Sequence, residues 1–181
     1  KEIIDNSIDE FTMGYGKEID IIFEDKNIVI RDYGRGIPLG KLVDCVSKIN
    51  TGGKYDSKVF KKSVGLNGVG TKAVNALSSK FFVRSIREGK QKSAEFSKGV
   101  LIKEFGIEGC DLSNGTETIF TPDSSIFIGY KFLVEHINTL LWNYAYLNAG
   151  LKINFNGKQI VSKNGLLDLL KNRTSNQKLY Y

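Results

Sequence analysis

Apolar and polar positions at the start of the chain repeat with the period of an α-helix. Three apolar side chains fall on one side of a helical wheel: Ile4, Ile8 and Phe11. The opposite side carries polar residues: Glu2, Asp5, Asn6 and Asp9. Glu2 and Asn6 are one turn apart, so a carboxylate and a carboxamide stand next to each other. The pattern predicts an amphipathic helix at residues 1–10, whose polar face, taken alone, is typical of a solvated surface.

Alternation with a period of two then predicts a hairpin. Its strands are expected at residues 18–23 and 27–31, and the second strand delivers Asp32 at its end. Closely spaced glycines and Pro38 follow, and a short helix is expected at residues 39–47. Residues 50–64 show little periodicity and are long for a loop, which is typical of a functional lid or of a disordered segment.

The second half of the chain predicts meander strands and one long helix. A glycine-rich turn runs into a helix at residues 71–77, and Pro122 ends a strand at 115–122. The long helix is expected at 128–148, with an inner face of Phe132, Ile137, Leu140, Leu141, Tyr144 and Leu147. The remaining expectations are strands at 80–88, 93–96, 100–105 and 151–155, a loop at 108–114, a hairpin turn at 156–157 and a short helix at 165–170.

This order of elements predicts an α+β two-layer sandwich, in which helices lie on one face of a mixed, mostly antiparallel sheet. With 181 residues, of which 41% are hydrophobic, the chain is long enough for one globular domain with a real core. No segment approaches the roughly 18 apolar residues that a membrane span needs, so no membrane contact is expected.

Cysteine and histidine are too scarce for several kinds of site. The chain has two cysteines, Cys45 and Cys110, which lack metal spacing, and a single histidine, His136. A disulfide framework, a zinc site and a histidine-dependent triad are therefore not expected, and a reducing cytoplasm fits best. The net charge of +6 permits phosphate-rich partners, but the basic residues are spread along the chain, so direct reading of a DNA sequence is not expected.

Four motifs occur in a defined order. They are Glu-x-x-x-Asn on a helix (residues 2–6), Asp-x-Gly-x-Gly after a strand (32–36), Gly-x-x-Gly-x-Gly entering a helix (65–70) and Gly-Thr opening a strand (115–116). A glycine-rich turn at a helix start presents free backbone N–H groups to an anion. The βαβ context of a dinucleotide fingerprint is missing and no P-loop sequence is present, so both of those phosphate sites are disfavoured.

The ordered set resembles the GHKL, or Bergerat-fold, ATPases, and within them the ATPase domain of bacterial type II topoisomerases. The resemblance extends over essentially the whole chain, and its matching segments are residues 2–10, 31–38, 51–54, 64–70 and 75–78. The B subunits of topoisomerase IV and of DNA gyrase share these motifs. Asn67 stands where gyrase typically has histidine, which favours the topoisomerase IV type.

The resemblance implies a role for each motif residue near the base and the reacting phosphate. Glu2 is expected to be the general base that activates water against the γ-phosphate of ATP, and Asn6 to complete the coordination of Mg²⁺. Asp32 is expected to accept a hydrogen bond from the adenine amino group, with Thr116 and Gly36 beside it. The resemblance also places an ion pair of Arg35 with Glu10, together with Ile37 and Pro38, at the adenine edge.

The phosphates are expected to be held by Lys54 and by the turn that comprises Leu66, Asn67, Gly68, Val69 and Gly70, with residues 50–64 as the lid. Arg87 matches a residue at the pocket mouth where aminocoumarin inhibitors bind in the family. Asp5 is expected to contact the residues that bind the nucleotide, and not the nucleotide itself.

The resemblance also implies partners and boundaries. They are a DNA-cleaving A-type subunit, a second B subunit on ATP binding, DNA in the full-length complex, and ATP-site inhibitors, in the bacterial cytoplasm close to the nucleoid. The ATPase domain is expected at residues 1–170, lacking its N-terminal arm, and residues 171–181 should begin the connection to a transducer domain. Such a fragment is expected to be weakly active and monomeric.

Two alternatives remain open at this point. One is another GHKL protein, such as a histidine kinase, a mismatch-repair ATPase or a heat-shock chaperone, because these share the acid and glycine motifs. The other is a basic nucleic-acid-binding module without catalysis, whose affinity would depend on salt and survive Asp32→Asn.

Overall fold

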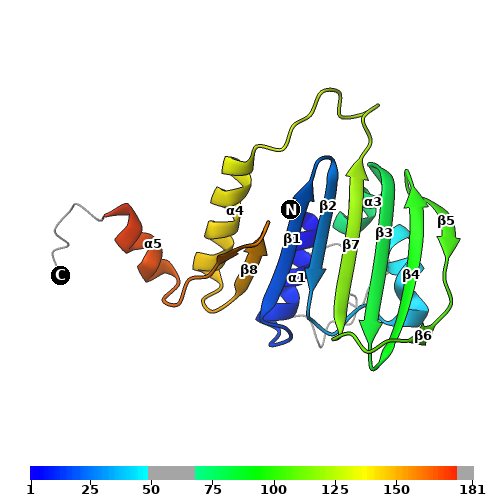
Figure 1. The fold of residues 1–181 in the computed structure, drawn as a ribbon, viewed down its shortest axis with the longest axis horizontal. Coiled ribbons are helices and arrows are strands. Elements are labelled where there is room, and N and C mark those ends of the chain that lie inside the picture. The colour runs from blue at the N-terminus through cyan, green and yellow to red at the C-terminus, as the bar shows by residue number, and fades with distance from the viewer. Residues whose placement is uncertain (49–67, 175–181) are drawn as a thin grey trace.

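The structure is a computed structural model that describes residues 1–48 and 68–174. Within these residues the frame is one nine-stranded sheet (Figure 1), with the spatial order β5-β4-β3-β7-β2-β1-β8-β9 and the short β6 paired with β4. β1 and β8 are parallel, and the other pairs are antiparallel. In chain order the strands are β1 (Glu18–Glu24), β2 (Asn27–Asp32), β3 (Ser78–Arg87), β4 (Lys90–Ser97), β5 (Val100–Glu104), β6 (Glu108–Gly109), β7 (Gly115–Pro122), β8 (Lys152–Phe155) and β9 (Lys158–Ile160).

Helices cover one face of this sheet. α1 (Glu2–Thr12) and α4 (Val134–Leu147) lie over the β1, β2 and β8 side, and α2 (Leu42–Ser47) and α3 (Gly70–Ala76) lie over β3 and β4 (Figure 1). The 3-10 turn η1 (Leu39–Lys41) leads into α2. α5 (Leu166–Arg173) contacts α4 beyond the edge of the sheet. The expected two-layer sandwich is therefore confirmed.

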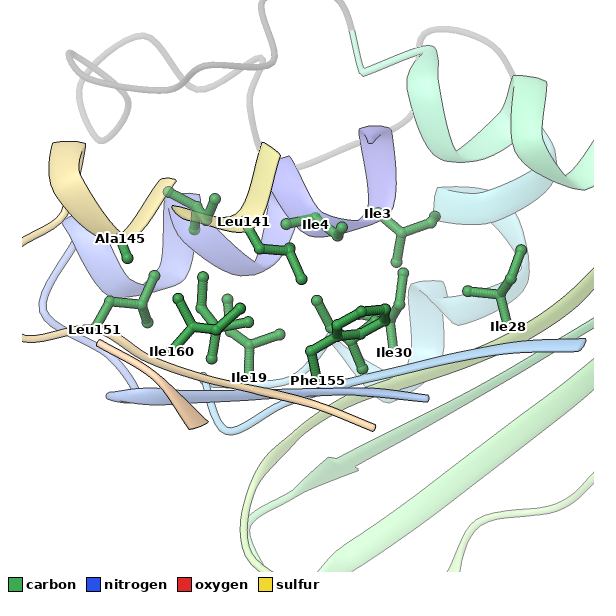
Figure 2. Packing of buried hydrophobic residues seen from close by; sticks show 13 residues of the cluster. Ile3, Ile4, Ile19, Ile28, Ile30, Leu141, Ala145, Leu151, Phe155 and Ile160 are labelled. Atoms are coloured by element: carbon green, nitrogen blue, oxygen red, sulfur yellow. The ribbon is translucent and has the colours of Figure 1, made fainter. Parts of the chain in front are cut away.

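The larger of two core clusters fixes α1 to the sheet. Ile3 and Ile4 point down from α1, and Leu141 and Ala145 point down from α4, onto the side chains of β1, β2 and β8 (Figure 2). Ile8 of α1 belongs to the same cluster. Ile21, Leu141 and Ile153 have no exposed surface. Each such side chain stabilises the fold by about 1.5–3 kcal/mol through burial. Because burial fixes the apolar stripe of α1 against the sheet, it also fixes the direction in which the polar stripe of the same helix faces.

The second cluster fixes α2 to the other half of the sheet. Leu42 and Val46 from α2 pack on Phe81, Val83 and Phe96, together with Ala94. Val74 of α3 and Phe120 of β7 contact both clusters. The two halves of the helical layer therefore pack on one continuous apolar surface of the sheet.

The opposite face of the sheet carries a row of alternating charges. The register places Asp20 beside Arg31, Arg31 beside Glu117, and Glu117 beside Arg84. Arg84 Nη2 lies 2.8 Å from Glu117 Oε2. Opposite charges on neighbouring strands stabilise this pairing, and they match a sheet face that is not part of the core.

The hairpin of β1 and β2, the strand β7 and the turn at Asn156 and Gly157 are confirmed. The helix expected at residues 39–47 is divided into η1 and α2, and a two-residue strand, β6, lies in the stretch expected to be a loop. α5 continues to Arg173, beyond the expected helix end.

The expected start of the long helix at residue 128 is wrong, because α4 begins at Val134. Gly129 takes a φ of +65°, and Phe132 packs edge-on against Phe23 with ring centroids 5.0 Å apart. The backbone is extended at Leu133, directly before the helix. Two residues expected on the inner helix face are also misplaced: Phe132 precedes the helix, and Leu147 is 68% exposed. Among the described residues, no helix has the length and apolar character that a membrane span requires.

Candidate functional site

The polar stripe of α1 meets the start of α3. The Asn6 Nδ2 donates a hydrogen bond to Thr71 Oγ1 at 2.7 Å, across 65 positions of sequence. The Glu2 carboxylate lies against Gly70, where an added Cβ would sit 2.1 Å from Glu2 Oε2. Glycine at this position therefore lets a carboxylate approach the first turn of α3.

Asp32 lies at the end of β2 with a buried carboxylate. Its Oδ1 accepts hydrogen bonds from the backbone N–H of Gly34 at 2.9 Å and of Thr116 at 3.2 Å. Within the described residues no donor reaches the other oxygen, Oδ2. Burial raises the pKa of Asp32 from its ordinary 3.8 to about 6, although both backbone hydrogen bonds oppose this shift. A buried acceptor with unused capacity is suited to bind a ligand N–H group.

The loop after Asp32 is held tightly against β3 and β7. Gly36 has a φ of +77°, and an added Cβ would lie 2.5 Å from the backbone oxygen of Ile86. Ser85 Oγ donates to the carbonyl oxygen of Ile37 at 2.7 Å. Gly115 has a φ of +139°, and an added Cβ would lie 2.0 Å from the Asp32 carbonyl oxygen. The glycines of the Asp-x-Gly-x-Gly and Gly-Thr motifs are therefore required by backbone packing around Asp32.

The expected pair of Glu10 and Arg35 is present. Arg35 Nη2 lies 2.9 Å from Glu10 Oε1. The hydrogen bond and charge of Glu10 raise the pKa of the Arg35 guanidinium, although partial burial opposes this shift. The pair joins the C-terminal half of α1 to the loop that follows Asp32, which carries Ile37 and the exposed Pro38.

The phosphate end of the expected site is described in part. Gly68, Val69 and Gly70 lead into α3, and the ammonium group of Lys72 donates to the Gly68 carbonyl oxygen at 2.5 Å. Lys72 is only 6% exposed, and burial lowers its pKa. Lys72 belongs to none of the sequence motifs, and its one sequence signal is its position two residues after the last motif glycine. Lys54, Leu66 and Asn67 lie outside the described residues.

The structure also places the remaining expected residues. Arg87 is at the end of β3, next to the Ile86 carbonyl that faces Gly36, and its Nε lies 3.2 Å from Glu88 Oε1. Thr116 contacts Asp32 through its backbone rather than through its hydroxyl. Asp5 and Asp9, from the polar side of α1, are 5% and 2% exposed, so this part of the polar side is covered, whereas Glu2 is exposed.

The residues present fit a magnesium nucleotide. Mg²⁺ takes oxygen ligands, and in nucleotide sites it uses one or two protein groups plus phosphate and water. The described residues hold no group of three or more His, Cys, Asp or Glu side chains that would make a dedicated metal cage. Because Asn6 Nδ2 donates to Thr71, its Oδ1 is the atom that could ligate the ion.

Comparison with known proteins also indicates a nucleotide site. The family model described as "Histidine kinase-, DNA gyrase B-, and HSP90-like ATPase" matches residues 1–123. The B subunit of DNA topoisomerase 4 from Borreliella burgdorferi is 56% identical over 181 residues, which is 100% of this chain and 30% of that protein. The B subunit of DNA gyrase from Thermus thermophilus is 36% identical over 179 residues, covering 93% of this chain and 28% of that protein.

A solved structure is similar over almost the whole chain. It is the crystal structure of the 43K ATPase domain of Thermus thermophilus gyrase B in complex with an aminocoumarin, with a TM-score of 0.84 and 29% sequence identity. The match covers 99% of this chain and 50% of that one. The chain therefore spans half of that ATPase domain and less than a third of the curated relatives described here.

Proposed function

The chain belongs to the family of histidine kinase-, DNA gyrase B- and HSP90-like ATPases, and we propose that its polar helix and glycine loops form the ATP site of a type II topoisomerase of the gyrase B kind. The observation that carries the proposal is the convergence of the four motifs on one face of the sheet. Glu2 and Asn6 meet the start of α3, and Asp32 meets Thr116.

Asp32 supplies the recognition of adenine. The amino group of the base donates to the carboxylate at the oxygen that the backbone leaves unused. A purine without that donor leaves a buried carboxylate unpaired, which costs about 1–3 kcal/mol or more. The rigid packing of Gly36 and Gly115 fixes the backbone around this contact.

Glu2 supplies the chemistry. Its carboxylate accepts a proton from the water whose oxygen attacks the γ-phosphorus, and the bond from phosphorus to the β,γ-bridging oxygen breaks to release ADP and phosphate. A positioned general base contributes roughly 10²–10⁴-fold to the rate. Asn6 would hold Mg²⁺, which neutralises charge on the phosphates when bound. A neutral carboxamide suits this position, because a further carboxylate would repel the nucleotide.

The turn before α3 and the residues around Arg87 complete the proposed site. The backbone of Gly68, Val69 and Gly70, with Lys54, Leu66 and Asn67, would hold the phosphates. Arg87, at the end of β3, would lie at the pocket mouth. The aminocoumarin in the similar gyrase B structure makes this class of inhibitor the first to test on the present chain.

In the full-length protein this domain would drive DNA strand passage. ATP binding would close a dimer of B subunits, and hydrolysis would reopen it, while an A-type subunit cleaves the DNA in the bacterial cytoplasm. The match with the Borreliella burgdorferi relative favours topoisomerase IV over gyrase. Residues 1–170 as the ATPase domain and 171–181 as a connection to a transducer domain stay predictions.

The direct test of this site is nucleotide affinity in Asp32→Asn. Calorimetry with a non-hydrolysable ATP analogue should show at least a hundredfold loss, because the amide places a donor against the adenine amino group. Asp20→Asn is the matched control: Asp20 lies on the other face of the sheet, where its carboxylate accepts from Tyr33 and Asn154. Unchanged affinity in Asp32→Asn would reject the proposed adenine site.

A further inference from the structure

Asp5 is a buried acid in the first turns of the helix that carries Glu2 and Asn6. It is 5% exposed, and both carboxylate oxygens have partners. Oδ1 accepts a hydrogen bond from the hydroxyl of Tyr144, and Oδ2 forms an ion pair with the ammonium group of Lys1. A buried carboxylate is stabilised only when such partners are present, so these contacts restrict the orientation of this part of α1.

Tyr144 reaches Asp5 from α4, 139 positions away in the sequence. Its ring packs partly buried on the same core as Ile4, Leu141 and Ala145, which bring α4 alongside α1 (Figure 2). Phenylalanine would fill that part of the core equally well. The hydroxyl is therefore the feature that apolar packing does not explain.

The charges of both acids act on this hydroxyl. Burial raises the pKa of Tyr144, and so do its hydrogen bond to Asp5 and the negative charges of Asp5 and Glu2. The phenol thus stays protonated and remains a donor across the neutral pH range. Its hydrogen atom is directed to Asp5, three residues after Glu2 on the helix.

We propose that Tyr144 is a positioning residue for ATP hydrolysis: through Asp5, its hydroxyl orients the N-terminal turn of α1 and so the Glu2 carboxylate. The proposal rests on the role proposed above for Glu2. The groups proposed to bind the base lie elsewhere, on β2 and β7, and Asn6 has its own tie to Thr71. Loss of the hydroxyl should therefore affect turnover more than nucleotide binding, since misplacing a reacting group by about 1 Å can cost on the order of a hundredfold in rate.

The test uses the full-length protein together with its A-type partner. Tyr144→Phe should lower kcat for ATP about tenfold with KM changed less than about twofold. Tyr146→Phe is the matched control on the same helix, because its hydroxyl accepts a hydrogen bond from Asn172 of α5 and not from a residue of α1. It should leave kcat unchanged. Asp5→Ala should reproduce the kcat loss, and the double variant should lose no more than the worse single variant, because both remove one interaction.

Two outcomes would overturn the proposal. One is a Tyr144→Phe protein that keeps kcat within about twofold, including one in which only the melting temperature falls, which would make the bond merely structural. The other is additive loss in the double variant. Glu2→Gln, measured in parallel, distinguishes failure of the proposed base from failure of the positioning role. If Glu2→Gln leaves turnover intact, the proposed base is wrong. If Glu2→Gln abolishes turnover and Tyr144→Phe is neutral, only the positioning role of Tyr144 fails.

Discussion

The guanidinium of Arg35 and the carboxylate of Glu10 meet at two points, with Nε 3.0 Å from Oε2 and Nη2 2.9 Å from Oε1. The same Oε2 accepts the backbone N–H of Arg35 at 2.9 Å, and the guanidinium lies 4.3 Å from the ring centroid of Tyr15. A planar, two-point pair fixes the angle between its partners as well as their distance. It therefore fastens α1, with the proposed base at one end, to the proposed adenine loop.

Arg35→Ala should weaken nucleotide binding severalfold while costing about 1 kcal/mol or less of unfolding free energy. The small cost follows from side-chain exposures of 31% and 22%, because water screens the pair. Calorimetry and urea unfolding measure the two quantities. Arg84→Ala is the matched control, since its pair with Glu117 is similarly exposed but lies on the opposite sheet face. Equal loss of affinity in both variants would remove the special role of the Arg35 pair.

Gly36→Ala should abolish binding of adenine ligands and destabilise the fold by roughly 1–3 kcal/mol. The added Cβ would lie 2.5 Å from the Ile86 backbone oxygen at a φ of +77°, so the loop must move. Gly40→Ala provides the comparison, because nothing lies within 4 Å of its added Cβ. Thermal unfolding and inhibitor titration of both variants test the claim, and a Gly36→Ala protein with normal affinity would show that the loop does not shape the site.

Local patterns were enough to predict much of the fold. The apolar stripe of α1, the hairpin that ends at Asp32 and the strand closed by Pro122 depend on short-range alternation and on glycine and proline signals. The start of α4 could not be predicted in this way. Ile128 and Phe132 have helical spacing, but Phe132 packs instead on Phe23, which is more than a hundred positions away in the sequence.

The same distinction applies to the site. The motifs of the site stand out in the sequence because acids, an asparagine and glycines occur at short, characteristic spacing. These motifs contain Glu2, Asn6, Asp32 and Gly36. The hydrogen bond from Tyr144 to Asp5 has no local signal, since a tyrosine on an apolar helix face is typical of a core residue. Lys72 is similar: only the folded turn shows that its ammonium group reaches the Gly68 carbonyl.

Nucleotide affinity should depend on pH through Asp32. Burial raises its pKa to about 6, so the carboxylate is ionised at pH 7 and becomes protonated as the pH falls below about 6. Affinity for an ATP analogue should be constant above about pH 7 and fall up to about tenfold per unit below that pKa. Calorimetry between pH 5 and 8, with circular dichroism to confirm folding, measures this profile.

Stability should respond to Asp32 in the opposite direction. Because the folded-state pKa lies above its ordinary value of 3.8, the group's contribution is fully present below that value and is lost as the pH rises through about 6. An affinity profile that is flat down to pH 5 would contradict a buried, ligand-binding Asp32.

Asn75→Ala should destabilise the protein by about 2 kcal/mol. Asn75 has no exposed surface, and its Nδ2 donates to the Val46 carbonyl oxygen at 3.0 Å, which ties α3 to α2. Urea unfolding measures the cost. Asn27→Ala, at an exposed asparagine whose side chain accepts from Thr121, should cost under about 0.5 kcal/mol. A cost for Asn75→Ala no larger than that of this control would show that the link between the helices is not stabilising.

The most direct test of the account is Glu2→Gln in the full-length protein, with ATP binding and ATP turnover measured on the same preparation. The glutamine keeps the size of the side chain that lies against Gly70 but cannot accept the proton from water. Affinity should stay within about twofold, while turnover falls at least about a hundredfold. Turnover within a few-fold of the unchanged protein would contradict Glu2 as the base of an ATPase site.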